Sequence, residues 1–296
     1  MKHVFKRAGY ILMLLLAYMV FQVFFTFVAV MAAIFYADAK GYISIASFEQ
    51  VLDYGDLMSS PAMSDISVWT VSIGLFVSSV AMLFFLYFVK GYRLKLGIFK
   101  SMSCKSLFLS TMLVLSSMFA LNIFVQWLGL DDNMEVLFGD IAHNILGVIT
   151  ISLIAPLLEE VLFRGAIQGY MMRYYNPWTA IVCAALIFGV THMNPVQTVY
   201  AALIGVIFGW IYYRTGSLLS VIVGHVLNNS MAAVTLLFFP ESKTLPMPEG
   251  LSSEAQVASE VVAFLLFAAL SVFFAIKLHR TQPPVPSPWR DVTDAV

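Results

Sequence analysis

Long apolar runs constrain this chain more than any other feature. Of its 296 residues, 60% are hydrophobic and 11% are charged, whereas a soluble domain carries about 25% charged residues. A helix needs about 20 mainly apolar residues to cross a bilayer. Runs of that kind predict eight spans, near residues 8–37, 66–89, 106–128, 141–163, 178–194, 197–213, 217–239 and 257–277. The sequence therefore predicts an all-α, polytopic helix bundle embedded in the cell membrane.

The basic residues predict the orientation of this bundle. With eight spans, all 16 Lys and Arg residues except Lys40 and Lys243 fall in connections on one side, and most acidic residues fall on the other. Connections rich in Lys and Arg stay in the cytoplasm. We therefore expect both termini to be cytoplasmic.

The chain is predicted to form a single membrane-embedded helical domain, residues 1–280, followed by a Pro-rich disordered tail, residues 281–296. Residues 90–105 mix basic and apolar positions, which fits either an interfacial segment or a plain basic loop. The outer loop of residues 38–65 has room for a short helix. The two cysteines have neither disulfide nor metal-site spacing, and the net charge of −1 gives no indication of a nucleic-acid partner.

Three ionisable residues, Glu159, Glu160 and Arg164, stand within two helical turns of an apolar span. A charge at the centre of a bilayer costs roughly 2.5–3.5 kcal/mol on insertion scales, so such residues usually pair or serve a pathway or reaction. On a helix Glu160 lies beside Arg164, and Glu159 is turned about 100° away. One interpretation makes Glu160 and Arg164 a structural ion pair, with Arg164 reaching the cytoplasmic interface by snorkelling. Glu159, which has no partner within its own helix, fits a general base.

His192 is the second polar feature. A lone histidine near the end of a span is more often a packing residue. For His192, however, the distance along the chain from Glu159 favours a place in the same site. The two residues are 33 positions apart, with the polar turn at residues 174–177 midway between them. Antiparallel helices would place both about 16 residues from that turn, at about the same depth.

His225 and Asn229 form the third feature, four residues apart on one face of the seventh span, with Asn228 predicted to point elsewhere. His225 lies only about 8–10 residues, roughly 12–15 Å, from the preceding turn, which makes it shallower than the other two groups. This mismatch disappears if the hairpin that contains Arg173 projects roughly 10 Å beyond the interface. Pro156 favours a bend in the fourth helix.

Together these groups supply what hydrolysis of an amide by water needs: a base, a proton carrier and donors for the developing oxyanion. A zinc site made of Glu159, His192 and His225 is the alternative, although the sequence contains no His-Glu-x-x-His helix. No serine or cysteine stands beside the set as an obvious nucleophile. Activated water, with no cofactor required, is the more economical hypothesis.

The motifs resemble those of the CPBP family, the CaaX proteases and bacteriocin-processing enzymes, also called the Abi family. The three matches are Glu-Glu-x-x-x-Arg at residues 159–164, Phe-x-x-x-His at residues 188–192 and His-x-x-x-Asn at residues 225–229. They follow the family's order, and the resemblance covers about residues 140–240.

This resemblance implies an eight-span bundle with an intramembrane cavity open to the cytoplasm. It also implies that Glu159 with His192 activates water and that His225 with Asn229 stabilises the oxyanion. Many members of the family are described as metalloproteases, whereas its better-studied CaaX enzymes resemble glutamate-dependent proteases. We favour the metal-independent chemistry and keep zinc as the alternative.

The leading hypothesis is an intramembrane endopeptidase that cuts a membrane-associated or lipidated peptide, of CaaX or bacteriocin type. A proton- or cation-coupled transporter is the second hypothesis, because intramembrane carboxylates and histidines also mark such pathways. A catalytically silent adaptor or immunity protein is the third.

Overall fold

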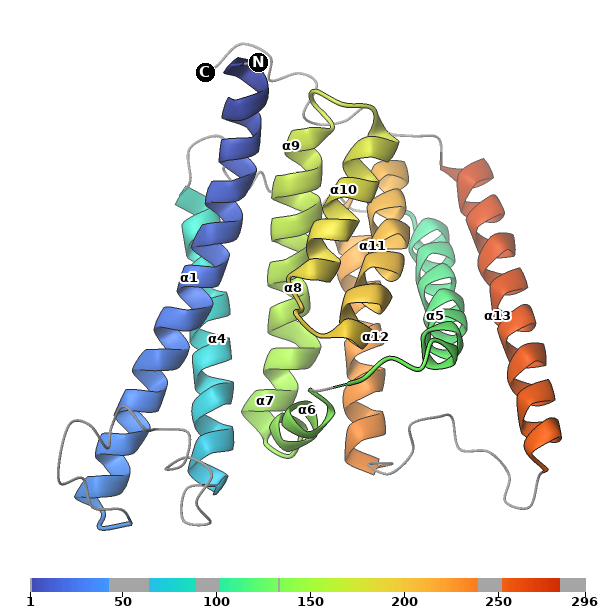
Figure 1. The fold of residues 1–296 in the computed structure, drawn as a ribbon. Helices are drawn as coiled ribbons and strands as arrows, with labels where there is room; N and C mark the ends of the chain where they lie inside the picture. The colour runs from blue at the N-terminus through green and yellow to red at the C-terminus, as the bar shows by residue number, and fades with distance from the viewer. Residues whose placement is uncertain (1, 43–63, 89–101, 133, 239–251, 283–296) are drawn as a thin grey trace.

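The computed structural model describes residues 2–42, 64–88, 102–132, 134–238 and 252–282 (Figure 1). Within these residues the chain forms helices and no strand. The helices, including two π-helical segments labelled η, are α1 (Lys2–Ala39), α4 (Ser64–Phe88), α5 (Cys104–Trp127), α6 (Glu135–Ala142), α7 (Ile145–Ile149), η2 (Thr150–Ile154), α8 (Ala155–Glu159), η3 (Glu160–Gln168), α9 (Gly169–Met171), α10 (Pro177–Val190), α11 (Pro195–Thr215), α12 (Leu218–Phe238) and α13 (Ser253–Thr281).

All eight predicted apolar segments are helical, and the polytopic helical bundle is confirmed. Seven helices of the described chain are long and apolar enough to cross a membrane. The fifth segment, α10, has only 14 residues, or about 21 Å, less than the roughly 30 Å of a hydrocarbon core. The turn after α10 lies nearer the middle of the bundle than the lower ends of α1, α4 and α12 (Figure 1).

The fourth span differs from its predicted bounds of 141–163. It runs over Ile145–Met171, 27 residues, as one continuous helical rod from α7 to α9. Arg164 therefore lies inside the span with only 1% of its surface exposed. The prediction that Arg164 snorkels to the interface was wrong, because its charge is paired inside the bundle instead.

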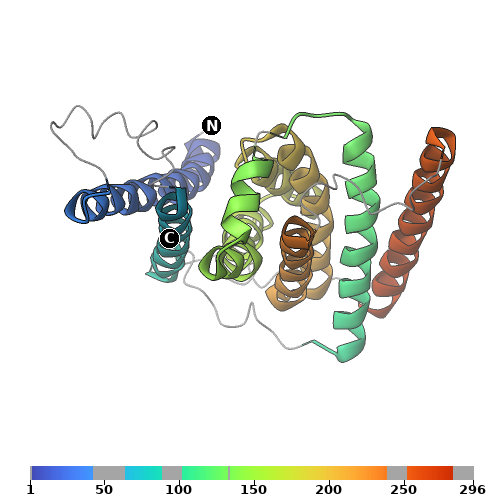
Figure 2. The same ribbon diagram turned by 90° about the horizontal axis from the view of Figure 1, so that it is seen from below.

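Helices pair around this fourth span. α1 packs along α4, α5 packs along α13, and α10 forms an antiparallel hairpin with α11. Figure 2 shows the fourth span and α12 side by side at the centre, nearly end-on, with α5 and α13 inclined across one flank. The predicted site residues all lie on the fourth span, the hairpin and α12.

Local sequence signals set the ends of the hairpin helices. Asn176 and Asn194 each stand before a proline, and their side chains accept hydrogen bonds from the backbone N–H groups of Thr179 and Gln197. Asparagine is a favoured N-cap, and proline at the first helical position needs no hydrogen-bond partner. The start of the fourth span is fixed in a similar way, because Asn144 accepts from the Gly147 N–H and donates to the Ser72 hydroxyl of α4.

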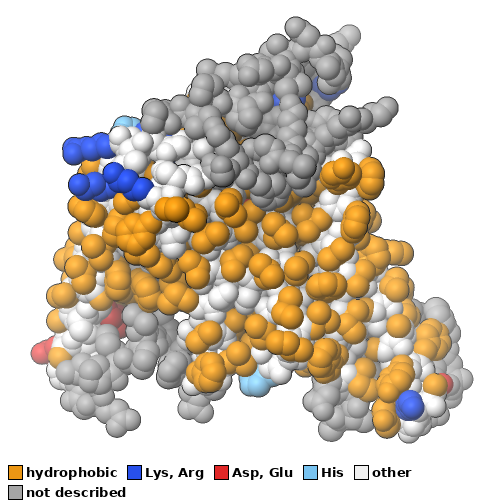
Figure 3. All heavy atoms as spheres, turned by 180° about the vertical axis from the view of Figure 1, so that it is seen from behind, with side chains coloured by type: hydrophobic (Ala, Val, Ile, Leu, Met, Phe, Trp, Pro, Cys, Tyr) orange, Lys and Arg blue, Asp and Glu red, His pale blue; other side chains and the backbone are white. Residues whose placement is uncertain are grey.

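Charge divides between the two ends of the bundle. α1 begins and α13 ends at the same end (Figure 1). Lys and Arg side chains gather at that end in Figure 3, hydrophobic side chains cover the middle, and acidic side chains appear toward the other end. This division agrees with the predicted segregation of charge; the cytoplasmic location of the basic end stays a prediction.

Several predictions concern segments that lie mainly outside the described residues. They are the interfacial or basic stretch 90–105, of which residues 102–105 are described, the outer loop 38–65, and the Pro-rich tail 281–296, of which residues 281–282 are described. The single domain of residues 1–280 likewise stays a prediction.

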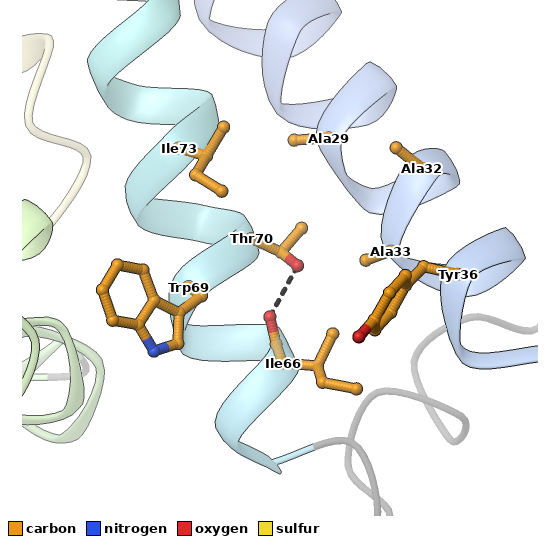
Figure 4. A pocket seen from close by; sticks show the side chains of 8 residues that line it. All are labelled: Ala29, Ala32, Ala33, Tyr36, Ile66, Trp69, Thr70 and Ile73. Carbon is orange, nitrogen blue, oxygen red and sulfur yellow. Dashed lines mark hydrogen bonds between the residues drawn. The ribbon is translucent and has the colours of Figure 1, made fainter. Parts of the chain in front are cut away.

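A pocket between α1 and α4 lies apart from the predicted site (Figure 4). Its walls include Ala29, Ala33, Trp69 and Thr70, and its eight lining residues include no carboxylate, histidine or cysteine. The Thr70 hydroxyl donates to the Ile66 carbonyl of its own helix at 2.6 Å. The pocket therefore offers an apolar surface and no catalytic group.

Gly189 permits the close contact between α10 and α11 that carries His192. A Cβ at this position would lie 2.5 Å from the Thr198 carbonyl oxygen and 2.9 Å from the Ala202 Cβ. We expect Gly189→Ala to destabilise the protein by about 1–3 kcal/mol, the usual cost of overpacking. Thermal unfolding in detergent measures this loss of stability. Gly9→Ala is the control, because a Cβ added at Gly9 would have no neighbouring atom within 4 Å. Equal melting temperatures for the two variants would contradict the close packing described.

Candidate active site

Glu159 and Glu160 both face the imidazole of His225. The Nδ1 atom of His225 lies 2.7 Å from Oε1 of Glu160, and its Nε2 atom lies 3.5 Å from Oε2 of Glu159. α12 thus places His225 between two carboxylates at the junction of α8 and η3. Direct contact puts His225 level with both glutamates, as their predicted convergence required. The turn between α9 and α10 lies beyond the ends of α11 and α12 (Figure 1); its projection beyond the membrane interface stays a prediction.

The two glutamates have different environments. Glu160 has a completely buried side chain, whereas 14% of the Glu159 side chain is exposed. Oε1 of Glu160 accepts from both Arg164 Nη1, at 2.9 Å, and His225 Nδ1. Oε1 of Glu160 is therefore engaged with internal partners, and Glu159 is the partly exposed carboxylate of the two.

Arg164 is the buried cation of the cluster, and its predicted ion pair with Glu160 is confirmed. Its second nitrogen, Nη2, donates to the Gly205 carbonyl at 3.4 Å. The guanidinium carbon lies 4.3 Å from the ring centre of Phe188 and 5.2 Å from that of Phe208. A buried charge is tolerated when it is paired and hydrogen-bonded, and cation–π contacts add to this in a desolvated site.

The His225 ring is held by aromatic contacts as well as by the carboxylates. Its centre lies 5.0 Å from that of Phe208 and 5.9 Å from that of Phe188, the latter edge to face. Phe188 also meets His192 edge to face at 4.9 Å. Phe188 therefore links the two histidines and Arg164.

His192 follows α10 at the turn into α11. Its Nδ1 atom lies 2.9 Å from the Phe188 carbonyl oxygen. A carbonyl only accepts, so Nδ1 carries the proton and Nε2 of the neutral ring is a free base. The next residue, Met193, has a φ of 51°, in the left-handed region that non-glycine residues seldom adopt. This conformation reverses the chain directly after His192, whose side chain stays partly exposed.

Asn229 lies one turn after His225, also partly exposed. Its Nδ2 group donates to the Ile151 carbonyl of η2 at 2.9 Å, and its Oδ1 accepts from Asn228 Nδ2 at 3.0 Å. An amide nitrogen carries two hydrogens. One of these hydrogens is donated to the Ile151 carbonyl, and the second can be donated to another acceptor.

Two π-helical segments shape the fourth span here. η2 and η3 flank α8, the single turn that begins at Ala155–Pro156 and ends at Glu159. Pro156 has no N–H to donate to a helical hydrogen bond. π-helical turns within α-helices often occur at functional sites. Pro156 lies in the first turn of α8, between these two segments, and the predicted bend at this residue stays a prediction.

Sequence reasoning missed several residues that complete the cluster. The sequence analysis did not single out Phe208, Tyr200 or Gln168, and it predicted that Asn228 points elsewhere. Gln168 is fully buried and donates to the Gly209 carbonyl at 2.9 Å, one turn beyond the Arg164–Gly205 contact. A polar residue four positions after Arg164 was the one signal that could have indicated it.

The zinc alternative would use Glu159, His192 and His225 as ligands. Among the described side chains, no three His, Cys, Asp or Glu residues come together as a metal-ligand set. The Nδ1 atoms of His192 and His225 already face a carbonyl and a carboxylate. A metal-binding histidine often donates its other ring N–H in this way, so these contacts do not decide between the metal-independent and the zinc alternatives, and zinc stays untested.

Comparison with known proteins identifies the segment that carries these residues. Residues 141–231 match the sequence model of a family described as "Type II CAAX prenyl endopeptidase Rce1-like". The predicted resemblance to the CPBP family is confirmed over this segment. The Rce1-like segment, residues 141–231, contains all six predicted site residues.

A protein of Bacillus subtilis with the curated name "Putative membrane peptidase YdiL" is 26% identical over 106 residues. The match covers 36% of this chain and 43% of that relative. The chain thus matches less than half the length of the relative. No solved structure matches the chain at a significant level.

Proposed function

We propose that this protein is an intramembrane endopeptidase that hydrolyses a peptide bond of a membrane-associated substrate. One observation carries the proposal: His225 joins a buried, ion-paired glutamate to a second, partly exposed glutamate inside a hydrophobic bundle. The Rce1-like segment matches a family described as an endopeptidase, which supports the same reaction class.

Charge balance supports the protonation states that the reaction needs. With His225 protonated, two carboxylates face two cations, Arg164 and His225, so the buried cluster is neutral. Its Nδ1–H donates to Glu160, and its Nε2–H points toward Glu159 and the partly exposed side of the cluster. Buried charges persist when they are compensated in this way.

Glu159 acts as the general base. It takes a proton from a water molecule, and His192 assists through its unprotonated Nε2 atom. The oxygen of that water attacks the carbonyl carbon of the substrate, whose oxygen becomes an oxyanion. Base catalysis of this kind contributes about 100- to 10,000-fold to a rate.

His225 and Asn229 stabilise the oxyanion. The Nε2–H of His225 and the second Nδ2–H of Asn229 are donors on one face of α12. Removal of one oxyanion donor typically costs about 100- to 1,000-fold in rate. The tetrahedral intermediate then collapses, the C–N bond breaks, and the proton held by Glu159 or His192 passes to the leaving amine. No step requires a metal ion.

The substrate is proposed to be a lipidated peptide, because the family description names prenyl substrates and the site lies within a membrane bundle. The test uses purified protein in liposomes with a farnesylated peptide that ends in a CaaX sequence. We expect cleavage of this peptide, and slower cleavage of the same peptide without the farnesyl group because it does not partition into the bilayer.

Equal cleavage of both peptides would remove the lipid from the proposal and point to a bacteriocin-type or other membrane peptide. Cleavage of neither, together with proton uptake into the liposomes, would instead support the transporter hypothesis.

A further inference from the structure

Three side-chain hydrogen bonds form a relay that ends at Asn229. The Tyr200 hydroxyl of α11 donates to Oδ1 of Asn228. Nδ2 of Asn228 donates to Oδ1 of Asn229 at 3.0 Å, and Nδ2 of Asn229 donates to the Ile151 carbonyl at 2.9 Å. The relay thus connects α11, α12 and η2, and no ion pair takes part in it.

Both ends of the relay determine which way the Asn229 amide faces. The Ile151 carbonyl can only accept, so it selects the nitrogen of Asn229. The oxygen of Asn229 must then face a donor, which Asn228 provides only if its own oxygen faces Tyr200. The Tyr200 hydroxyl, which can donate or accept, donates to that oxygen. The Ile151 carbonyl therefore sets the direction of the relay, and Tyr200 holds its far end in place.

Burial makes this orientation strict. Asn228 is 9% exposed, and Tyr200 is partly buried and packs against the hydrophobic core. In such surroundings hydrogen bonds are strong, and an unpaired polar group is costly. A reversed Asn229 amide would present its oxygen, an acceptor, where the proposed reaction needs a donor.

We propose that Tyr200, acting through Asn228, is a positioning residue that holds the Asn229 carboxamide with its N–H groups toward the oxyanion. Tyr200 itself touches no reacting atom. This inference rests on the proposed function and deepens it, since it assigns a role to two residues whose identities the three motifs do not specify.

The test compares Tyr200→Phe with Asn229→Ala and with the double variant, using cleavage of the farnesylated peptide. Tyr200→Phe should lower kcat by about 2- to 10-fold, the value of one neutral hydrogen bond, and leave KM unchanged. In the Asn229→Ala background the same change should have no further effect, because a residue that acts through another is not additive with it. Tyr213→Phe, a partly buried tyrosine on the same helix, should match the wild type.

Independent effects of Tyr200→Phe and Asn229→Ala that multiply in the double variant would overturn the relay. Failure of the proposed function looks different, because Glu159→Gln would then cleave as fast as the wild type or no variant would cleave at all.

A spectroscopic experiment tests the relay even if no variant cleaves the peptide. With asparagine labelled by a heavy nitrogen isotope, Tyr200→Phe should shift the side-chain amide signals of both Asn228 and Asn229. Signals of Asn229 that match those of the wild type would overturn the relay without any activity measurement.

Discussion

Glu159→Gln is expected to reduce peptide cleavage by about 100- to 10,000-fold, the usual effect of losing a general base. Glutamine keeps the size and most contacts of the side chain but cannot take a proton from water. Because Glu159 also faces His225 at 3.5 Å, the substitution removes a compensating charge as well as a base. Cleavage rates and melting temperatures measured on the same preparations therefore separate catalysis from stability.

The control for this experiment is Glu254→Gln, an exposed carboxylate in the first turn of α13. It should cleave at the rate of the wild type. A Glu159→Gln variant that cleaves as fast as Glu254→Gln would remove Glu159 from the reaction and, with it, the proposed mechanism.

Glu160→Ala is expected to have the largest effect on stability. It leaves Arg164 buried without its carboxylate and takes away the partner of His225 Nδ1. Removal of one member of a buried ion pair costs about 3–5 kcal/mol, mainly because the other charge stays unpaired. Unfolding by heat or denaturant in detergent measures this loss.

A paired replacement, Glu160→Leu with Arg164→Met, tests the physical reason for that cost. Apolar side chains of similar volume often replace a buried ion pair with little loss or with a gain. We expect the double variant to unfold at a higher temperature than Glu160→Ala. If Glu160→Ala melted with the wild type, the carboxylate would not be the compensating charge that the geometry indicates.

Hydropathy and local spacing predicted most of the fold. The long apolar runs become helices because a bilayer requires every backbone group to be paired within its own segment. The Asn-Pro signals mark where α10 and α11 begin, and the four-residue spacing of Glu160 and Arg164 predicted their ion pair. These features depend on residues close together in the chain.

The position of His225 between the two glutamates was not predictable in the same way. The depth estimate counted 1.5 Å per residue from the turns at residues 174–177 and 214–217. The fourth span instead contains two π-helical segments, whose rise and turn differ from those of a regular α-helix. No pattern of residue types in the sequence specified those segments.

The partners of Asn229 were missed for a related reason. A tyrosine in an apolar span, such as Tyr200, normally indicates packing. Its hydroxyl becomes informative only when α11 and α12 are seen to place it against Asn228. Contacts between helices that carry single polar groups depend on rotation and tilt, which composition does not determine.

Mass spectrometry of a farnesylated peptide incubated with the purified wild-type protein in liposomes, after treatment with a metal chelator, tests the central claim most directly. The account predicts two fragments whose masses sum to those of the peptide and one water, formed at the same rate with and without chelation. Absence of these fragments in the untreated sample, or their loss on chelation and return with added zinc, would contradict it.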